Sequence, residues 1–112
     1  MVIWKINYWD AHKKEASSIE AALDELTDEQ FKSLAKEIKL LEICGNALKL
    51  PHSKSLGKKL FELRERRFGY RIYYTFFGDK TITMLHIGDK SSQRNDIRIS
   101  KDRLTKLLKG DD

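Results

Sequence analysis

Apolar and polar side chains alternate over several stretches of the chain, and each stretch predicts a β-strand. Residues 2–8 are rich in β-branched and aromatic side chains and contain no turn former, which is typical of a strand. Between residues 60 and 87, three more β-prone runs are separated by turns at Gly69 and at Gly78 with Asp79. Because short turns join antiparallel neighbours, these runs predict an antiparallel meander to which the first strand is added.

Two stretches in the first half repeat apolar residues with the helical period. Ser17 with Glu20 and Thr27 with Gln30 have the spacing of a capping box, which satisfies free backbone N–H groups at the start of a helix. Apolar residues then recur on one face of each stretch until Gly45 supplies a stop. These stretches predict a hairpin of two helices packed on one face of the sheet.

The remaining segments complete a single-domain plan for residues 1–112. Residues 45–59 combine glycine, proline and polar side chains and are predicted to form a loop. A last helix is predicted from a partial apolar stripe formed by Ile97, Leu104, Leu107 and Leu108. The predicted fold is therefore an α+β sandwich of the order βααβββα, with one face of the sheet open.

Composition excludes several classes of protein. The chain has 112 residues, 40% of them apolar and 35% charged, as expected of a globular domain. Cys44 is the only cysteine and the three histidines are scattered, so neither a disulfide nor a metal site is expected. No cofactor motif is present. No apolar run approaches the roughly 20 residues that cross a bilayer, and the opening residues do not resemble a signal peptide. We therefore expect a cytoplasmic protein.

Positive charge is concentrated in two segments. The net charge of the chain is +5, whereas residues 1–48 carry −3, residues 49–71 carry +6 and residues 90–109 carry +5. If the fold brings the two basic segments together, they form a positive surface of the kind that binds polyanions. The alternative is a pair of solvated faces that keep the protein soluble.

Motifs between residues 50 and 98 carry a family resemblance. They read LPHSKSLGKKLFELR, GYRIYY and TMLHIGDKSSQRNDI, in this order. The series resembles the RelE/ParE superfamily of toxins from bacterial toxin–antitoxin modules, especially the HigB-like and phage-related addiction-module-killer branches. In the order of its elements, the resemblance spans nearly the whole chain.

This resemblance implies a toxin that enters the ribosome and cuts mRNA, as its RelE-like and HigB-like members do. It also implies a cognate antitoxin, which in HigB-like modules is usually a small helix-turn-helix protein. Two alternatives remain on the same fold, namely a ParE-like inhibitor of DNA gyrase and a basic RNA-binding domain without catalysis. The chain departs from some relatives in its last helix, which offers Asp96 where they place a catalytic tyrosine or histidine.

Two arginines are the first candidates for catalysis. When the 2′-hydroxyl of RNA attacks the adjacent phosphate, an enzyme must accept that proton, stabilise the phosphorane and protonate the leaving 5′-oxygen. Arginine suits the second task, because its planar fork grips phosphate at two points. Arg64 and Arg71 lie on the two arms of the predicted hairpin, and the resemblance matches both to basic positions of the family's active surface. Alternatively, Arg64 pairs with Glu62 or Glu65, and Arg71 is an edge residue stacked on Tyr73.

Proton transfer requires other residue types. Histidine titrates near neutrality unaided, and alternation groups His86 with Ile82 and Met84. We therefore predict that His86 is either a catalytic imidazole or a hydrogen-bonded histidine of the core. Lys90 follows this strand, at the position from which RelE-like relatives direct a basic residue at the leaving group. The resemblance thus implies that Lys90 is the acid.

Further basic and aromatic residues are expected to contact RNA, and the alternative for those in the loop and near the turn is a plain solvated charge. Lysine and arginine bind phosphates, and aromatic rings stack on unpaired bases. Because most aromatic residues of a meander face the core, only a minority of the rings can take part. The predicted contacts are His52, Lys54, Lys58, Lys59, Arg66, Tyr73 and Arg94.

Overall fold

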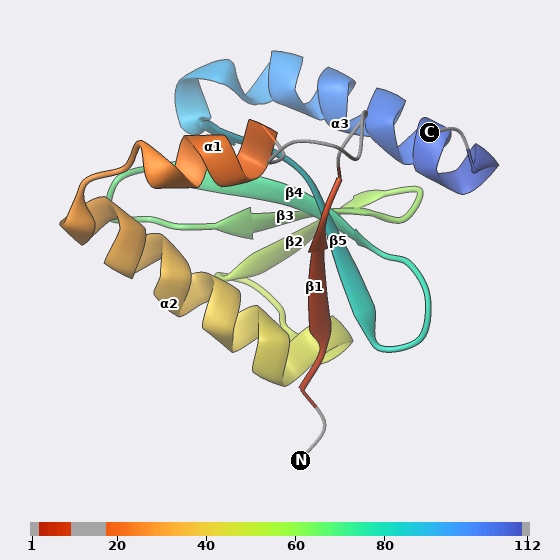
Figure 1. Ribbon diagram of the computed structural model, residues 1–112, viewed down its shortest axis with the longest axis horizontal. Helices are drawn as coiled ribbons and strands as arrows, with labels where there is room; N and C mark the ends of the chain where they lie inside the picture. Colours follow the sequence, from red (N-terminus) through yellow and green to blue (C-terminus); the bar gives the residue numbers. More distant parts are fainter. Residues whose placement is uncertain (1–2, 10–17, 111–112) are drawn as a thin grey trace.

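The computed structural model describes residues 3–9 and 18–110, which fold into a five-stranded sheet and three α-helices (Figure 1). The strands are β1 (Lys5–Tyr8), β2 (Ser53–Gly57), β3 (Leu60–Arg64), β4 (Tyr70–Phe76) and β5 (Thr81–Asp89). The helices are α1 (Ser18–Asp24), α2 (Asp28–Cys44) and α3 (Gln93–Lys109), with short 3-10 turns η1 (Gly45–Ala47) and η2 (Lys90–Ser92). The strand order is β1-β5-β4-β3-β2, with β1 parallel to β5 and the other pairs antiparallel. The predicted α+β class is confirmed.

The helical hairpin begins and ends where the sequence indicates. Thr27 and Gln30 form the predicted capping box, with N–O distances of 3.0 and 3.2 Å. Gly45 caps α2 with φ +54°, and a Cβ atom at this position would lie 2.1 Å from the Trp4 ring. Glycine is thus required there both for its backbone conformation and for space. Ser17, the other predicted cap, lies outside the described residues.

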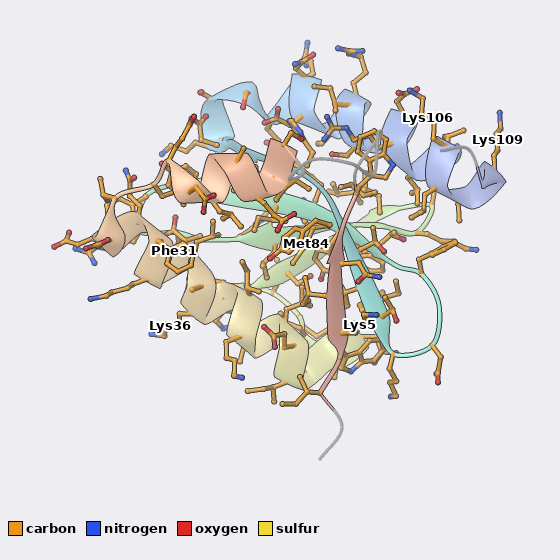
Figure 2. The ribbon with its side chains drawn as sticks, viewed as in Figure 1. Lys5, Phe31, Lys36, Met84, Lys106 and Lys109 are labelled. Carbon is orange, nitrogen blue, oxygen red and sulfur yellow. The ribbon has the colours of Figure 1, made fainter. Side chains whose placement is uncertain are left out.

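The main apolar core lies between the sheet and the pair α1 and α2. Alternation along β3, β4 and the first part of β5 directs every second side chain to this face. Figure 2 shows Met84 inside the molecule, whereas Lys36 on α2 and Lys106 on α3 point outwards. The buried residues of this core are Ile19, Leu23, Leu34, Leu41, Leu63, Ile72, Tyr74, Ile82 and Met84.

The second face of the sheet is covered by α3, so the prediction of an open face is wrong. In Figure 1 the sheet lies between α2 and α3. A smaller cluster of Leu60, Tyr73, Leu85 and Leu104 is buried on this side. Ile97 and Leu107 from the predicted apolar stripe pack against it, whereas Leu108 remains half exposed. Even a partial stripe is therefore enough to seat α3 on the sheet.

The predicted loop at residues 45–59 contains a strand that the sequence pattern does not indicate. β2 pairs antiparallel with β3 at the edge of the sheet. Its sequence, SKSLG, has a single large apolar residue, Leu56, and therefore shows no alternation. Ser53 is buried, and its hydroxyl is hydrogen-bonded to the hydroxyl of Tyr74. Tertiary pairing with β3, rather than local propensity, forms this strand.

Candidate functional site

A buried carboxylate on β3 lies at the centre of the α3-covered face. The side chain of Glu62 has no exposed surface. Its Oε1 accepts hydrogen bonds from Nε of Arg64 at 2.8 Å and from Nη1 of Arg71 at 3.0 Å. Its Oε2 accepts a hydrogen bond from Nε2 of Gln93, the first residue of α3, at 2.7 Å. One ionised side chain therefore connects two strands and a helix.

Arg64 and Arg71 are direct cross-strand partners on β3 and β4. Like charges in this position oppose strand pairing, and the shared carboxylate of Glu62 offsets their repulsion. Their side chains are 28% and 21% exposed, so part of each guanidinium reaches the surface. Arg64 therefore does pair with Glu62, as one prediction had it. Arg71 lies on a central strand, and the prediction that it is an edge residue is wrong.

The site keeps a positive charge at neutral pH. Burial by itself would raise the pKa of Glu62, but hydrogen bonds from Arg64, Gln93 and Arg71 outweigh it and lower the pKa. The carboxylate is therefore ionised at neutral pH. Two guanidinium groups face one carboxylate, which leaves one net positive charge on this group of three side chains.

Lys90 lies beside the hairpin that carries the two arginines. Its backbone N–H donates to the carbonyl of Gly69 at 3.0 Å. A Cβ atom on Gly69 would lie 3.6 Å from Cδ of Lys90. The side chain of Lys90 therefore runs over Gly69. Gly69 precedes Arg71 by two residues, so the structure brings Lys90 to the end of the hairpin next to the arginine pair. Lys90 is exposed.

Lys54 also lies on the arginine side of the sheet. The register aligns Lys54, Glu62, Tyr73 and His86 in one row across β2, β3, β4 and β5. Residues in one such row share a face of the sheet, so Lys54 flanks Glu62 at the edge. Lys54 is exposed and available to an anion.

The position of His86 differs from the prediction. The register pairs Tyr73 with His86 and Tyr74 with Met84, so that Leu85 is an extra residue in β5. This bulge turns His86 towards α3, and the prediction that it shares a face with Ile82 and Met84 is wrong.

Both ring nitrogens of His86 are occupied. Nε2 lies 2.8 Å from Oδ1 of Asp96, and Nδ1 lies 3.2 Å from Nη1 of Arg103. Because arginine can only donate, Nδ1 accepts and the proton of the neutral ring is on Nε2, facing Asp96. No ring nitrogen is left for a substrate. This geometry favours the hydrogen-bonded histidine over the catalytic imidazole.

The other predicted RNA contacts are distributed over three regions. Lys58 and Lys59 lie in the turn before β3, at the opposite end of that strand from Arg64. Arg94 and Arg98 line an open surface cavity of about 400 Å³ with Ser91, Ser92 and Asn95. Arg66 is exposed near the hairpin turn. All of these cations remain accessible.

Two further predicted contacts are constrained. Nδ1 of His52 lies 2.8 Å from Oε1 of Glu37 on α2, and its side chain is 34% exposed. Tyr73 is fully buried, so the prediction that its ring stacks on RNA is wrong. Burial, followed by the negative charges of Glu62 and Asp96, raises the pKa of the Tyr73 hydroxyl, which therefore stays protonated.

Glu65 has a structural role that the sequence reasoning did not identify. Its carboxylate accepts hydrogen bonds from the backbone N–H groups of Arg67, Phe68 and Tyr70, and from the hydroxyl of Ser33 on α2 at 2.7 Å. It thus shapes the turn between β3 and β4. The position of Glu65 shortly before Gly69 is the sequence signal for this role. That signal is weak, because a surface ion pair with Arg64 explains a glutamate at this position equally well.

Comparison with known proteins assigns the family. Residues 21–106 match the family described as phage derived protein Gp49-like. The chain belongs to this Gp49-like family. A search of curated protein sequences found no significant match.

Solved structures share the fold of this Gp49-like chain. A mutant of Escherichia coli RelE toxin in the free state is similar with a TM-score of 0.57 and 10% identity, over 86% of this chain and 96% of that one. The isolated E. coli RelE toxin gives 0.53 and 16%, over 86% and 98%. The toxin–antitoxin complex RelBE2 of Mycobacterium tuberculosis gives 0.51 and 17%, over 81% and 95%. The fold that the sequence resemblance implied is thus confirmed as RelE-like.

Two kinds of feature are absent from the described residues. None of the helices in residues 3–9 and 18–110 combines the length and the apolar character that a membrane crossing requires. Within the same residues, no group of three or more histidine, cysteine or acidic side chains is arranged to hold a metal ion.

Proposed function

We propose that this Gp49-like chain is the toxin of a toxin–antitoxin module and that it cuts mRNA on the ribosome, in the cytoplasm. The observation that carries the proposal is the cross-strand pair Arg64 and Arg71 on one partly exposed surface, with a net positive charge after Glu62 is counted. Such a pair suits a phosphate that gains negative charge in the transition state. The RelE-like fold supports the same class of activity.

The proposed reaction uses the RNA's own 2′-hydroxyl as nucleophile. Its oxygen gives its proton to solvent water, attacks the adjacent phosphorus and forms a 2′,3′-cyclic phosphate. The bond to the 5′-oxygen breaks, and that oxygen takes up a proton from the protein, which the solvent then replaces. Arg64 and Arg71 stabilise the crowded phosphorane, because their planar forks match phosphate oxygens. Lys90, beside the hairpin, is the proposed proton donor to the leaving oxygen. Lys54 holds a neighbouring phosphate.

A cognate antitoxin is the proposed partner, apart from the ribosome and its mRNA. The support is the fold shared with a chain of the toxin–antitoxin complex RelBE2. By the resemblance to HigB-like modules, the antitoxin is a helix-turn-helix protein. Co-expression with the product of a neighbouring short gene tests this partner: a stable complex that restores growth supports the proposal.

The test of activity compares Arg71→Ala with Lys36→Ala during induced expression, with toeprinting of translating ribosomes. Lys36 is exposed on α2 (Figure 2), so its removal changes the net charge equally without affecting the arginine pair. We expect wild type and Lys36→Ala to arrest growth and cut mRNA, and Arg71→Ala to lose about 100-fold in cleavage rate or more. Equal cleavage by a folded Arg71→Ala variant contradicts the assigned site. Growth arrest with intact mRNA and a DNA-damage response would instead identify a gyrase inhibitor.

A further inference from the structure

The arrangement of donors around Glu62 indicates more than relief of charge repulsion. Both arginines donate to the same oxygen, Oε1, at 2.8 and 3.0 Å. The carboxylate is fully buried, and a buried charge is costly unless it is well paired. A surface carboxylate could neutralise two arginines at a lower desolvation cost. Neutralising the two arginines therefore does not by itself explain why Glu62 is buried.

The contacts of Glu62 fix the orientation of both guanidinium groups. Arg64 donates through Nε and Arg71 through Nη1, so each arginine uses one of its five N–H groups. In the described part of the chain, the other N–H groups of these two side chains have no protein acceptor. Because both side chains are partly exposed, these donors are available to an incoming anion.

The carboxylate is itself held from the other side. Gln93 donates through Nε2 to Oε2 at 2.7 Å, so the two oxygens of Glu62 have separate tasks. Oε1 faces the arginines and Oε2 faces α3. A carboxylate that is bound at both oxygens cannot rotate freely, and its orientation is transmitted to the two arginines.

We propose that Glu62 is a positioning residue, which aligns Arg64 and Arg71 as one two-armed cradle for a phosphodiester, and that Gln93 fixes Glu62 in this role. The role rests on the function proposed above and adds to it a residue that does not touch the substrate. Long arginine side chains lose conformational freedom when they bind. A cradle that is aligned before binding spares this loss, and it favours the transition state through donors already in place.

The experiment compares Glu62→Gln with Glu65→Gln. Glu65 is the other buried glutamate of this hairpin, but it binds backbone N–H groups of the turn and not the arginines. On ribosome-bound mRNA, we expect Glu62→Gln to lower kcat by 10-fold to 100-fold and to change KM by less than threefold. We expect Glu65→Gln to keep kcat within threefold of wild type. An effect of Glu62→Gln on KM alone, or a kcat equal to wild type, would overturn the positioning role.

A readout without catalysis separates this role from the proposed function. In wild type, the Nε–H signal of Arg64 should be protected from solvent exchange in NMR spectra, because that group donates to Glu62. Inorganic phosphate should shift the signals of both arginines with one common Kd. We expect Glu62→Gln to lose the protection and to weaken phosphate binding at least threefold, and Glu65→Gln to retain both. If wild type binds phosphate in this way but cuts no mRNA, the proposed function fails while the cradle stands.

A second variant keeps the proposal testable if Glu62→Gln does not fold. Gln93→Ala removes only the contact to Oε2, at the half-buried first residue of α3. We expect a threefold to tenfold loss of kcat with unchanged KM, and faster solvent exchange at Nε of Arg64. Unchanged kcat together with unchanged exchange in a folded Gln93→Ala variant would show that Glu62 needs no such support, and would overturn the role of Gln93.

Discussion

The two faces of the sheet are built from the same strands but differ in chemistry. Towards α1 and α2, the strands direct apolar side chains such as Leu63, Ile72 and Met84 into a large apolar cluster. Towards α3, the same strands bury a small apolar cluster together with charged and polar side chains. The buried polar residues of this second face include Glu62, Thr75, Thr83, Asp96 and Ser100.

The two faces therefore contribute differently to stability and to the candidate site. Burial of apolar surface is the main favourable contribution to folding, whereas buried ion pairs contribute little net stability and cost much when one partner is removed. The face covered by the helical hairpin therefore holds the fold together. That support allows the α3 face to keep two arginines side by side, where they repel one another.

Truncation of the apolar face should have the largest effect on stability. Leu34 of α2 is fully buried, so Leu34→Ala should lower the free energy of unfolding by about 2–5 kcal/mol. Phe31 on the same helix is 47% exposed (Figure 2), and Phe31→Ala should cost less than about 1 kcal/mol. Urea unfolding followed by circular dichroism measures both. Similar losses for the two variants would refute the assignment of the core to this face.

Separation of α3 from the sheet should have the next largest effect. A Cβ atom on Gly88 of β5 would lie 1.9 Å from Oδ2 of Asp96, so Gly88→Ala should cost about 1–3 kcal/mol. The Asp96→Ala variant removes the atoms that clash. The double variant should therefore be more stable than the sum of the two single losses predicts, by about 1 kcal/mol or more. Additive losses in urea unfolding would mean that this close approach does not limit the packing of α3.

Acid should weaken the turn between β3 and β4 and its contact with α2, because both depend on the carboxylate of Glu65. Burial opposes ionisation of Glu65, but hydrogen bonds from Ser33 and from the backbone N–H groups of Phe68, Tyr70 and Arg67 outweigh it, so its pKa is lowered from 4.5. A lowered pKa gives stability that is fully present above the ordinary value and is lost as the pH falls through the folded value.

The midpoint of urea unfolding, measured between pH 7 and pH 3, should accordingly decrease below about pH 4.5. Glu65→Gln should be less stable than wild type at pH 7 and should show a smaller decrease on acidification. A pH profile of Glu65→Gln parallel to that of wild type would exclude Glu65 as a source of acid sensitivity.

Two adjacent tyrosines offer the smallest and sharpest comparison of the faces. Tyr74 points towards the helical hairpin and its hydroxyl bonds that of Ser53, so Tyr74→Phe should cost about 1 kcal/mol. Tyr73 points towards α3, and its buried hydroxyl makes no hydrogen bond with the described residues. Tyr73→Phe should therefore change the free energy of unfolding by less than about 0.5 kcal/mol. If Tyr73→Phe lowers the free energy of unfolding more than Tyr74→Phe does, the hydroxyl of Tyr73 and not that of Tyr74 makes the stabilising hydrogen bond.

The elements with strong local signals could be predicted from the sequence. The Thr27 and Gln30 box marks the start of α2, and alternation separates Leu63 from Glu62 and Arg64 on β3. β2 could not be predicted, since its residues acquire strand geometry only by pairing with β3. His86 was placed on the wrong face because a single extra residue, Leu85, reverses the alternation beyond it, and no residue type announces such a bulge.

The charged residues of the candidate site could be predicted from the sequence, but the hydrogen bonds that connect them could not. Arg64 and Arg71 could be paired from the hairpin pattern. The third partner, Gln93, comes from another element some 30 residues away in the chain, and only the packing of α3 brings it to Glu62. Contacts of this kind depend on tertiary structure, so neither period nor propensity encodes them locally.

Glu62 also serves the arginine pair as a built-in counter-ion. RNA carries condensed cations, and these are released in proportion to the number of phosphates that the protein neutralises. Because Glu62 cancels one of the two charges of Arg64 and Arg71, this pair neutralises fewer phosphates than two free arginines would. The ionic-strength dependence of RNA binding should consequently arise from the exposed lysines, above all Lys54 and Lys90.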